Sequence, residues 1–175
     1  MALIRAFKDL VPRIAEDCFL ADDAVIIGDV ELGSEVSIWY GSVLRGDCGH
    51  IRIGARTNIQ DLSLIHMTTV VSHTEIGQDV TLGHHVVVHG ARIGDRVLVG
   101  MGSVLLDNVE VGDECLIAAG SVVPPRMKIP ARSLVRGAPA KVIREVTPDE
   151  ALLGPNGAAT YLELMREHRR QQRGH

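Results

Sequence analysis

The segment IGDRVLVGMGSVLLDNVEV, residues 93–111, carries an aliphatic residue at every sixth position. These positions are Ile93, Val99, Leu105 and Val111. An amphipathic helix needs apolar residues three and four positions apart, so a six-residue period does not predict one. Short β-branched runs separated by Gly and Asp instead predict brief strands that are joined by tight corners.

The same period extends through most of the chain in both directions. It comprises Ile14, Leu20, Ile26, Leu32, Ile38 and Leu44, then Ile53, Ile59 and Ile65, then Ile76, Leu82 and Val88, and later Ile117 and Val123. Grouping three hexads per coil aligns one column of glycines, namely Gly33, Gly54, Gly77, Gly94 and Gly112. Stacked glycines predict a tight corner, because Gly tolerates unusual backbone dihedrals. The sequence therefore predicts an all-β, three-sided parallel β-helix whose coils bury a shared core.

The composition agrees with a repetitive architecture and excludes several classes of protein. The 175 residues are 46% hydrophobic but only 3% aromatic, so the core must consist of Val, Ile and Leu. Eighteen basic and 22 acidic residues give a net charge of −4, so we expect no nucleic-acid partner. The chain has no apolar run of about 18 residues, so we expect no membrane association. Three cysteines without metal-like spacing predict a reducing, cytoplasmic location.

The chain is expected to divide into a β-helix domain, residues 1–145, and a C-terminal helical appendage, residues 146–175, packed on it. Before the boundary, residues 133–144 could form a last extended strip that lies back along the prism. After it, Thr147-Pro-Asp-Glu150 fits a capping box with Pro at the first helical position.

Within the appendage, Gly154-Pro155 is expected to interrupt the first helix. A second helix is predicted from Ala158 to Arg170, with its apolar stripe on the prism. The basic run from Arg166 to Arg173 is interpreted as a solvated tail and not as a binding patch.

The six-residue period breaks at three places. The spacing is nine from Leu44 to Ile53, eleven from Ile65 to Ile76, and five from Val88 to Ile93. Irregularities in solenoids often map to a functional face. These three bracket His66, His84 and His89, which makes the histidines the candidate functional residues.

The register predicts which of these histidines lie together. His66 and His89 occupy the same position in adjacent coils, so they should stack on one edge, close enough to share a metal ion. Arg45 falls in the same column one coil earlier. The remaining histidines, His50, His73, His85, His168 and His175, are interpreted as surface or hydrogen-bonded residues.

The third histidine belongs to a different edge of the prism. His84 lies one coil above Asp61, with Gln60 as the neighbour of Asp61. A neighbouring chain could bring this edge to the His66–His89 pair, and a cyclic trimer would make three such composite sites. Three imidazoles with one open position are typical of catalytic zinc, although the ligand type also allows iron, cobalt or nickel. Trp39 is expected at an outward position beside this interface.

Several motifs together resemble the γ-class carbonic anhydrases over about residues 10 to 145. They are Ser37-Ile-Trp-Tyr-Gly-Ser-Val-Leu-Arg-Gly-Asp47, Ile53-Gly-Ala-Arg-Thr-Asn-Ile-Gln-Asp61, His66, and Gly83-His84 with His89-Gly90. The resemblance implies a left-handed β-helix homotrimer that reversibly hydrates CO2 to bicarbonate, with zinc between subunits. It implies that His66 and His89 of one subunit and His84 of the next bind the metal.

The resemblance also implies roles for four polar residues. Arg45 and Asp47 match the family's Arg-Gly-Asp, which is linked to bicarbonate contacts and interface ion pairing. The alternative to a direct role is a structural ion pair across the interface. Gln60 and Asp61 match the pair that binds and orients water and substrate beside the metal.

The sequence departs from the archetypal family members at two places. Cys48 stands where they carry a glutamate, and the 67–75 loop is short and has one acid, Glu75. Proton export would therefore fall to His73 or Glu75.

Two further functions remain open at this point. One is a non-catalytic scaffold, in which the metal only stabilises the trimer. The other is an acyl-CoA acyltransferase, because that group also uses hexapeptide β-helices.

Overall fold

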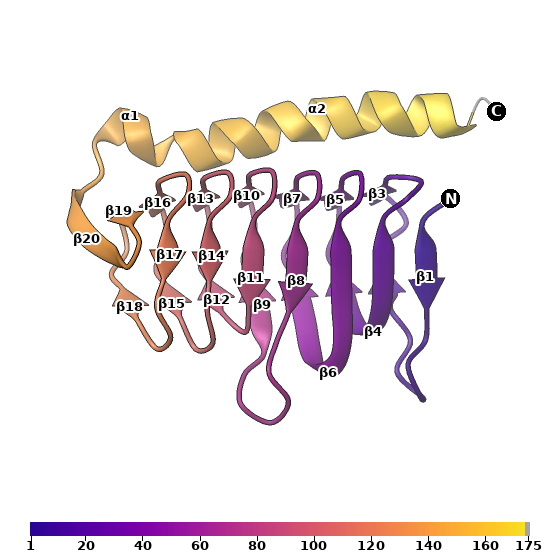
Figure 1. Cartoon of the computed structure of the whole chain (residues 1–175). Coiled ribbons are helices and arrows are strands. Elements are labelled where there is room, and N and C mark those ends of the chain that lie inside the picture. Colours follow the sequence, from indigo (N-terminus) through magenta and orange to yellow (C-terminus); the bar gives the residue numbers. More distant parts are fainter. Residues whose placement is uncertain (174–175) are drawn as a thin grey trace.

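The computed structural model describes residues 1–173, and these form a parallel β-helix with a long helix along one side (Figure 1). Its strands belong to two hydrogen-bonded sheets that wrap around the axis as three faces. Long strands β4 (Val25–Leu32) and β6 (Val43–Ile53) turn a corner and contribute to two of these faces. The predicted β-helix architecture is confirmed.

We name the three faces after the groups that they carry. The histidine face consists of β1 (Leu3–Arg5), the first halves of β4 and β6, β8 (Leu64–His66), β11 (Val87–His89), β14 (Val104–Leu105) and β17 (Val122–Val123). The charged face consists of β2 (Arg13–Ile14), the second halves of β4 and β6, β9 (Thr74–Ile76), β12 (Arg92–Ile93), β15 (Glu110–Val111) and β18 (Lys128–Ile129).

The helical face is the third side of the prism. It consists of β3 (Phe19–Leu20), β5 (Ser37–Ile38), β7 (Asn58–Ile59), β10 (Thr81–Leu82), β13 (Leu98–Val99), β16 (Leu116–Ile117), β19 (Ser133–Gly137) and the antiparallel β20 (Ala140–Glu145). Each parallel strand pairs with its equivalent one coil earlier and one coil later, so the same column position recurs along the axis.

The hexad residues fill the interior of the prism. Ile26, Leu44, Ile65, Val88, Leu105 and Val123 stack in register on the histidine face, each with 0% of its surface exposed. Full burial of one such side chain contributes about 1.5–3 kcal/mol. Repetition over the coils therefore supplies a large core without aromatic rings.

The glycine column lies at a corner as predicted, but the physical reason is different. A Cβ at Gly54 would lie 2.6 Å from the carbonyl carbon of Gly77 and 2.7 Å from the amide nitrogen of Gln78. Glycine is therefore required because successive coils approach closely. The left-handed backbone positions of this corner fall two residues later, on non-glycine residues such as Arg56 and Arg96, with φ of 57° and 58°.

The segment after the last parallel coil forms a hairpin. β19 continues the helical face, and β20 pairs with it in antiparallel fashion at the C-terminal end of the coil. The prediction that residues 133–144 lie back along the prism is therefore wrong. Because β20 covers the last rung, it closes that sheet edge against further pairing.

Two helices follow the hairpin. α1 (Pro148–Ala151) has Thr147 as its N-cap, with the predicted capping box to Glu150. α2 (Leu153–Arg173) starts directly after Leu152 and runs through Pro155, so the predicted start at Ala158 is wrong. Pro155 is tolerated because it lies in the first turn, where backbone amides have no partner within the helix. No helix among residues 1–173 combines the length and apolar character that crossing a membrane requires.

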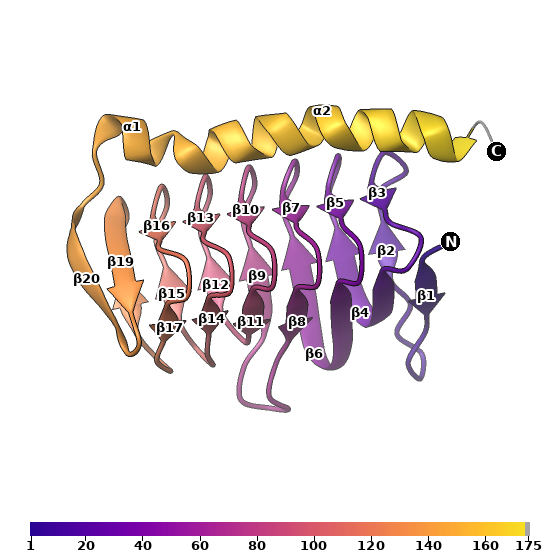
Figure 2. The same ribbon diagram turned by 45° about the horizontal axis from the view of Figure 1, so that its top comes forward.

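α2 runs along the axis of the coil and covers β3, β5, β7, β10 and β13 of the helical face (Figure 2). Trp39 points outward from the prism, as predicted, but α2 covers it and leaves only 5% of its surface exposed. Its ring centroid lies 5.0 Å from those of Phe19, Tyr161 and His168. Phe19, Trp39 and Tyr161 therefore anchor α2 on the helical face.

The basic end of α2 fastens the helix to the coil. Arg166 pairs with Glu35 at 2.6 Å, and Arg169 donates hydrogen bonds to the backbone carbonyl oxygens of Glu16 and Asp17. At least part of this run is thus bound to the prism, in contrast to the predicted solvated tail.

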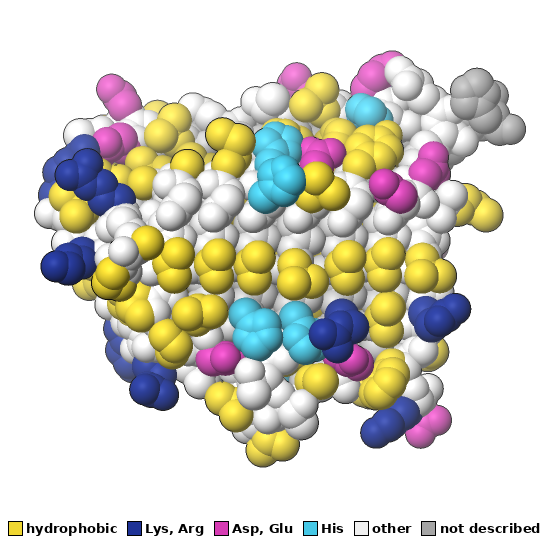
Figure 3. All heavy atoms as spheres, viewed as in Figure 1, with side chains coloured by type: hydrophobic (Ala, Val, Ile, Leu, Met, Phe, Trp, Pro, Cys, Tyr) yellow, Lys and Arg dark blue, Asp and Glu magenta, His cyan; other side chains and the backbone are white. Residues whose placement is uncertain are grey.

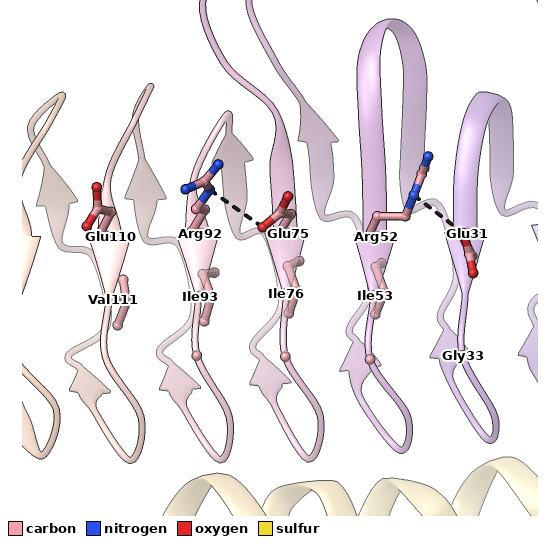
Figure 4. Close-up of a pocket in the computed structure, with 13 residues that line it drawn as sticks. Glu31, Gly33, Arg52, Ile53, Glu75, Ile76, Arg92, Ile93, Glu110 and Val111 are labelled. Carbon is pink, nitrogen blue, oxygen red and sulfur yellow. Dashed lines mark ion pairs between the residues drawn. The ribbon is translucent and has the colours of Figure 1, made fainter.

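The charged face displays an alternating ladder of side chains along a groove of about 600 Å³ (Figure 4). The residues of this ladder are paired on neighbouring strands and are, in order along the axis, Arg13, Glu31, Arg52, Glu75, Arg92, Glu110 and Lys128. Alternation prevents like charges from meeting on neighbouring strands, which would destabilise the stack. Of the residues that the sequence singles out for the reaction, the lining includes Glu75, a candidate for proton export, but none of the predicted metal ligands.

Candidate metal centre

His66 and His89 lie side by side at the ends of β8 and β11. Their strands are paired so that His89 is the direct partner of His66. Nδ1 of His66 is 3.4 Å from Nε2 of His89. Two imidazoles on a tetrahedral ion, with nitrogen–metal bonds of about 2.0–2.1 Å, have nitrogens about 3.4 Å apart. The separation therefore fits a shared metal ion.

Each of these two histidines has a carboxylate at its other ring nitrogen. Nε2 of His66 is 3.0 Å from Oδ1 of Asp47, and Nδ1 of His89 is 3.2 Å from Oδ1 of Asp107. Histidines that bind metals usually donate their second N–H to a carboxylate or carbonyl group, which fixes the ring and its tautomer.

His84 lies at the corner between the helical face and the histidine face. Its Nδ1 is 2.8 Å from Oδ2 of Asp61, the residue one coil below it. The predicted stacking of His84 on Asp61 is therefore correct, and Asp61 pairs with this histidine. About 37% of the His84 side chain is exposed, compared with 13% for His66.

All three histidines thus share one arrangement. An ionised carboxylate can only accept a hydrogen bond, so the ring nitrogen that faces it carries the proton. The lone pair then stays on the other nitrogen, which is Nδ1 of His66 and Nε2 of His84 and His89. The residues present fit a divalent cation of the zinc type, which prefers imidazole nitrogen.

The two histidine groups occupy opposite edges of the same face. In Figure 3, one histidine group lies just below a row of hydrophobic side chains and another lies above the middle of that row. This row is the outward column of the histidine face, made of Leu3, Val25, Val43, Leu64, Val87, Val104 and Val122. One subunit therefore brings together His66 and His89 but not His84.

Burial and hydrogen bonding act in opposite directions on the carboxylates beside His66 and His89. Burial of Asp47 acts to raise its pKa, but hydrogen bonds from Arg45, His66 and Cys48 outweigh it, and the pKa is lowered. The pKa of Asp107 is lowered in the same way, because hydrogen bonds from Ser72 and Thr68 outweigh its burial. Both side chains therefore stay ionised and able to orient a histidine.

Arg45 and Gln60 occupy different surroundings. Arg45 donates from Nη1 to Oδ2 of Asp47 at 2.6 Å, so the two form an ion pair within one chain. Gln60 is 6% exposed, and its amide donates to Oδ1 of Asn58 at 3.2 Å. Within one subunit, Gln60 therefore belongs to a polar ladder beside the His84 corner.

Asp107 is the residue of this centre that sequence reasoning missed. Ser72 and Thr68, both in the 67–75 loop, donate hydrogen bonds to its carboxylate. Asp107 thereby ties this loop to His89. The only signal was its position in the coil after His89, and the contact is diagonal: Asp107 lies two positions after Leu105, whereas His89 lies one position after Val88.

The other histidines are not all independent surface residues. His50 and His73 stack with ring centroids 4.1 Å apart, and Nε2 of His50 is 3.2 Å from Glu75. Glu75 also belongs to the ladder of the charged face. His168 approaches the Tyr40 hydroxyl at 3.3 Å, whereas His175 lies outside the described residues.

Fold and site together define a hexapeptide-repeat β-helix protein with a histidine centre at the edges of one face. A model of the bacterial transferase hexapeptide family (six repeats) matches residues 90–125. YrdA from Escherichia coli is 48% identical over 154 residues, which are 85% of this chain and 84% of that protein. A carbonic anhydrase from Geobacillus kaustophilus is 46% identical, over 85% of this chain and 81% of that protein.

The name of a plant relative places it in the γ class of carbonic anhydrases. Mitochondrial γ-carbonic anhydrase 2 from Arabidopsis thaliana is 42% identical over 91% of this chain, which corresponds to 59% of the longer plant protein. The chain belongs to the γ-carbonic anhydrase family of hexapeptide-repeat proteins.

The fold comparison agrees with this family. A Bacillus cereus structure, described as a candidate acetyltransferase, superimposes with a TM-score of 0.93 at 40% identity. The match covers 95% of this chain and 96% of that one. Both the coil and the C-terminal helix are therefore shared with a solved relative.

Proposed function

We propose that the protein is a metal-dependent carbonic anhydrase that reversibly hydrates CO2 to bicarbonate as a cyclic homotrimer. Each site would consist of His66 and His89 of one subunit and His84 of the next, with zinc as the metal and Fe2+ or Co2+ as possible replacements. The observation that carries the proposal is the set of three histidines, each with one nitrogen paired to a carboxylate and the other left for a metal. The names of the relatives support CO2 as the substrate.

The trimer follows from the shape of the histidine face. Its outward column is aliphatic, with Leu64 38% exposed and Leu3 45% exposed, and a histidine group lies at each edge. A head-to-tail contact repeated around a three-fold axis would set the His84 corner of one subunit against the His66–His89 edge of the next. It would also bury the aliphatic column, which favours association.

The reaction adds water across one C=O bond of CO2 and releases a proton. The metal would supply Lewis acidity, which lowers the pKa of water to near neutrality. Asp47, Asp61 and Asp107 would hold the three imidazoles in one tautomer, and Arg45 would hold Asp47. Gln60 and Asp61 would provide hydrogen-bonding groups beside His84 for water or a substrate oxygen.

Elemental analysis of the purified trimer, together with stopped-flow CO2 hydration, tests this function. We expect about one metal ion per chain and hydration by reduced protein that is faster than buffer alone. Chelation should remove the metal ion and the CO2 hydration activity, and added Zn2+ should restore both. Fully loaded protein that hydrates CO2 no faster than buffer would contradict catalysis and leave the metal-stabilised scaffold.

An acyl-CoA acyltransferase is the second candidate function. It is favoured by the description of the Bacillus cereus relative and by the transferase name of the hexapeptide family. Transfer of the acetyl group from acetyl-CoA by metal-free protein would support it. The three carboxylate-paired histidines favour the metal-dependent reaction instead, because one histidine is sufficient for a general base.

Asp107 provides a prediction for the metal centre. Asp107→Asn should weaken metal binding about 10- to 100-fold, because it removes the charge that orients His89. Calorimetric titration with Zn2+ measures the affinity. Asp113→Asn is the matched control, since Asp113 accepts its hydrogen bond from the backbone of Asp95 at another corner. Equal affinity of the two variants would mean that Asp107 only anchors the 67–75 loop.

The cellular location is part of the same proposal. Cys18, Cys48 and Cys115 are free thiols, as expected in a reducing compartment. We therefore place the protein in the cytoplasm, although the Arabidopsis relative is named as mitochondrial.

A further inference from the structure

His66 has a second set of potential metal-binding neighbours in its own chain. The donor atoms of Asp47, Cys48 and His66 all lie within 4.8 Å of one another. Asp47 and Cys48 come from β6 and His66 comes from the adjacent β8, so no second subunit is needed. All three residues are partly buried.

The three donors form a chemically suitable set. A thiolate, an imidazole and a carboxylate are all zinc ligands, with bonds of about 2.0–2.3 Å. Two such ligands on a tetrahedral ion lie about 3.3–3.8 Å apart. The group therefore has to contract by about 1.5 Å at most, which small side-chain rotations achieve. The thiolate also disfavours Mg2+ and Ca2+, which prefer oxygen.

Cys48 differs from the other two cysteines in its surroundings. Cys18 donates its thiol hydrogen to the carbonyl of Gly33, and burial raises its pKa to about 11. Cys115 donates to the carbonyl of Pro130, and burial raises its pKa as well. Among residues 1–173, neither of these two cysteines belongs to a group with a histidine and a carboxylate like that of Cys48. Cys48, in contrast, donates its hydrogen bond to Asp47.

We propose that Asp47, Cys48 and His66 form a metal site within one subunit that binds a thiophilic divalent cation such as Zn2+. Binding would release the thiol proton of Cys48. It would also move the proton of His66 from Nε2 to Nδ1, because Nε2 faces Asp47 at 3.0 Å. A neutral imidazole has one lone-pair nitrogen at a time. His66 can therefore serve this site or the interface site, but not both as a neutral ligand.

This competition gives the site a role in metal loading. A separate subunit could hold an ion before assembly, and formation of the trimer would add His84 of the neighbouring subunit to the pair that His66 already forms with His89. The shared use of His66 rests on the proposed function. The existence of the site within one subunit rests only on Asp47, Cys48 and His66.

Cobalt binding to the full-length chain with His84→Ala and His89→Ala tests the inference. These substitutions remove the other histidines of the interface centre and leave the proposed site intact. We expect about one Co2+ per chain, with a thiolate-to-cobalt charge-transfer band in the near ultraviolet. Adding Cys48→Ser to this variant should abolish the band and weaken binding at least 100-fold, whereas adding Cys115→Ser should preserve both.

Two outcomes would overturn the inference. One is no cobalt binding by the His84→Ala, His89→Ala chain although circular dichroism shows it folded. The other is a band that survives both Cys48→Ser and Cys48→Ala. The absorption does not depend on CO2 hydration, so a failure of the proposed catalytic function leaves this test intact.

Discussion

His84→Ala should reduce CO2 hydration by more than about 100-fold, which is the upper end of the loss expected for an outer-shell partner of a metal ligand. The expected cause is loss of the ligand that the neighbouring subunit supplies to each site. Stopped-flow CO2 hydration by trimer isolated by gel filtration measures the loss. The coil itself should be unaffected, because His84 lies at an exposed corner and contributes nothing to the core.

The adjacent histidine offers a matched control. His85 is exposed and lies at the same corner, with φ of 59°. His85→Ala should therefore leave metal content and CO2 hydration near those of the natural protein. Equal losses in the two variants would point to damage of the corner and not to removal of a ligand.

Gly54→Ala should destabilise the protein by about 3 kcal/mol, the upper part of the usual range for overpacking. The added methyl group would lie 2.6–2.7 Å from backbone atoms of Gly77 and Gln78, which belong to the next coil. Backbone cannot rotate away as a side chain can, so the two coils must separate locally. Urea unfolding at a fixed protein concentration measures the change.

Gly102→Ala separates crowding from backbone strain. Gly102 has φ of 69°, but no atom lies within 4 Å of the position of an added Cβ. This variant should cost only about 1 kcal/mol, from the left-handed backbone alone. If Gly102→Ala destabilises the protein as much as Gly54→Ala, close approach of the coils is not the reason for the glycine column.

The fold was predictable because its information is repeated along the chain. Ile65 and Val88 mark the same place in adjacent coils, and the structure pairs them directly. The C-terminal part has no repeat, so its hairpin and the start of α2 could not be predicted by counting hexads. The burial of Trp39 was missed for the same reason, because only the packed helix shows what covers this outward side chain.

The candidate site was predictable as far as the register holds. His66 beside His89, and His84 above Asp61, follow from counting hexads. Asp107 could not be found this way, because it stands two positions after Leu105 whereas His89 stands one position after Val88, so the two are not register partners. The hand of the coil also lies beyond residue counting, since the hexad period is the same for either hand.

Subunit mixing tests the central claim, that each metal site is shared between two chains. The variants His84→Ala and His89→Ala should each be inactive. Trimers that are refolded from an equal mixture should regain about a quarter of the natural activity, because about a quarter of their contacts combine an intact His66–His89 edge with an intact His84 corner. Mixed trimers that stay as inactive as their parents would contradict the shared site.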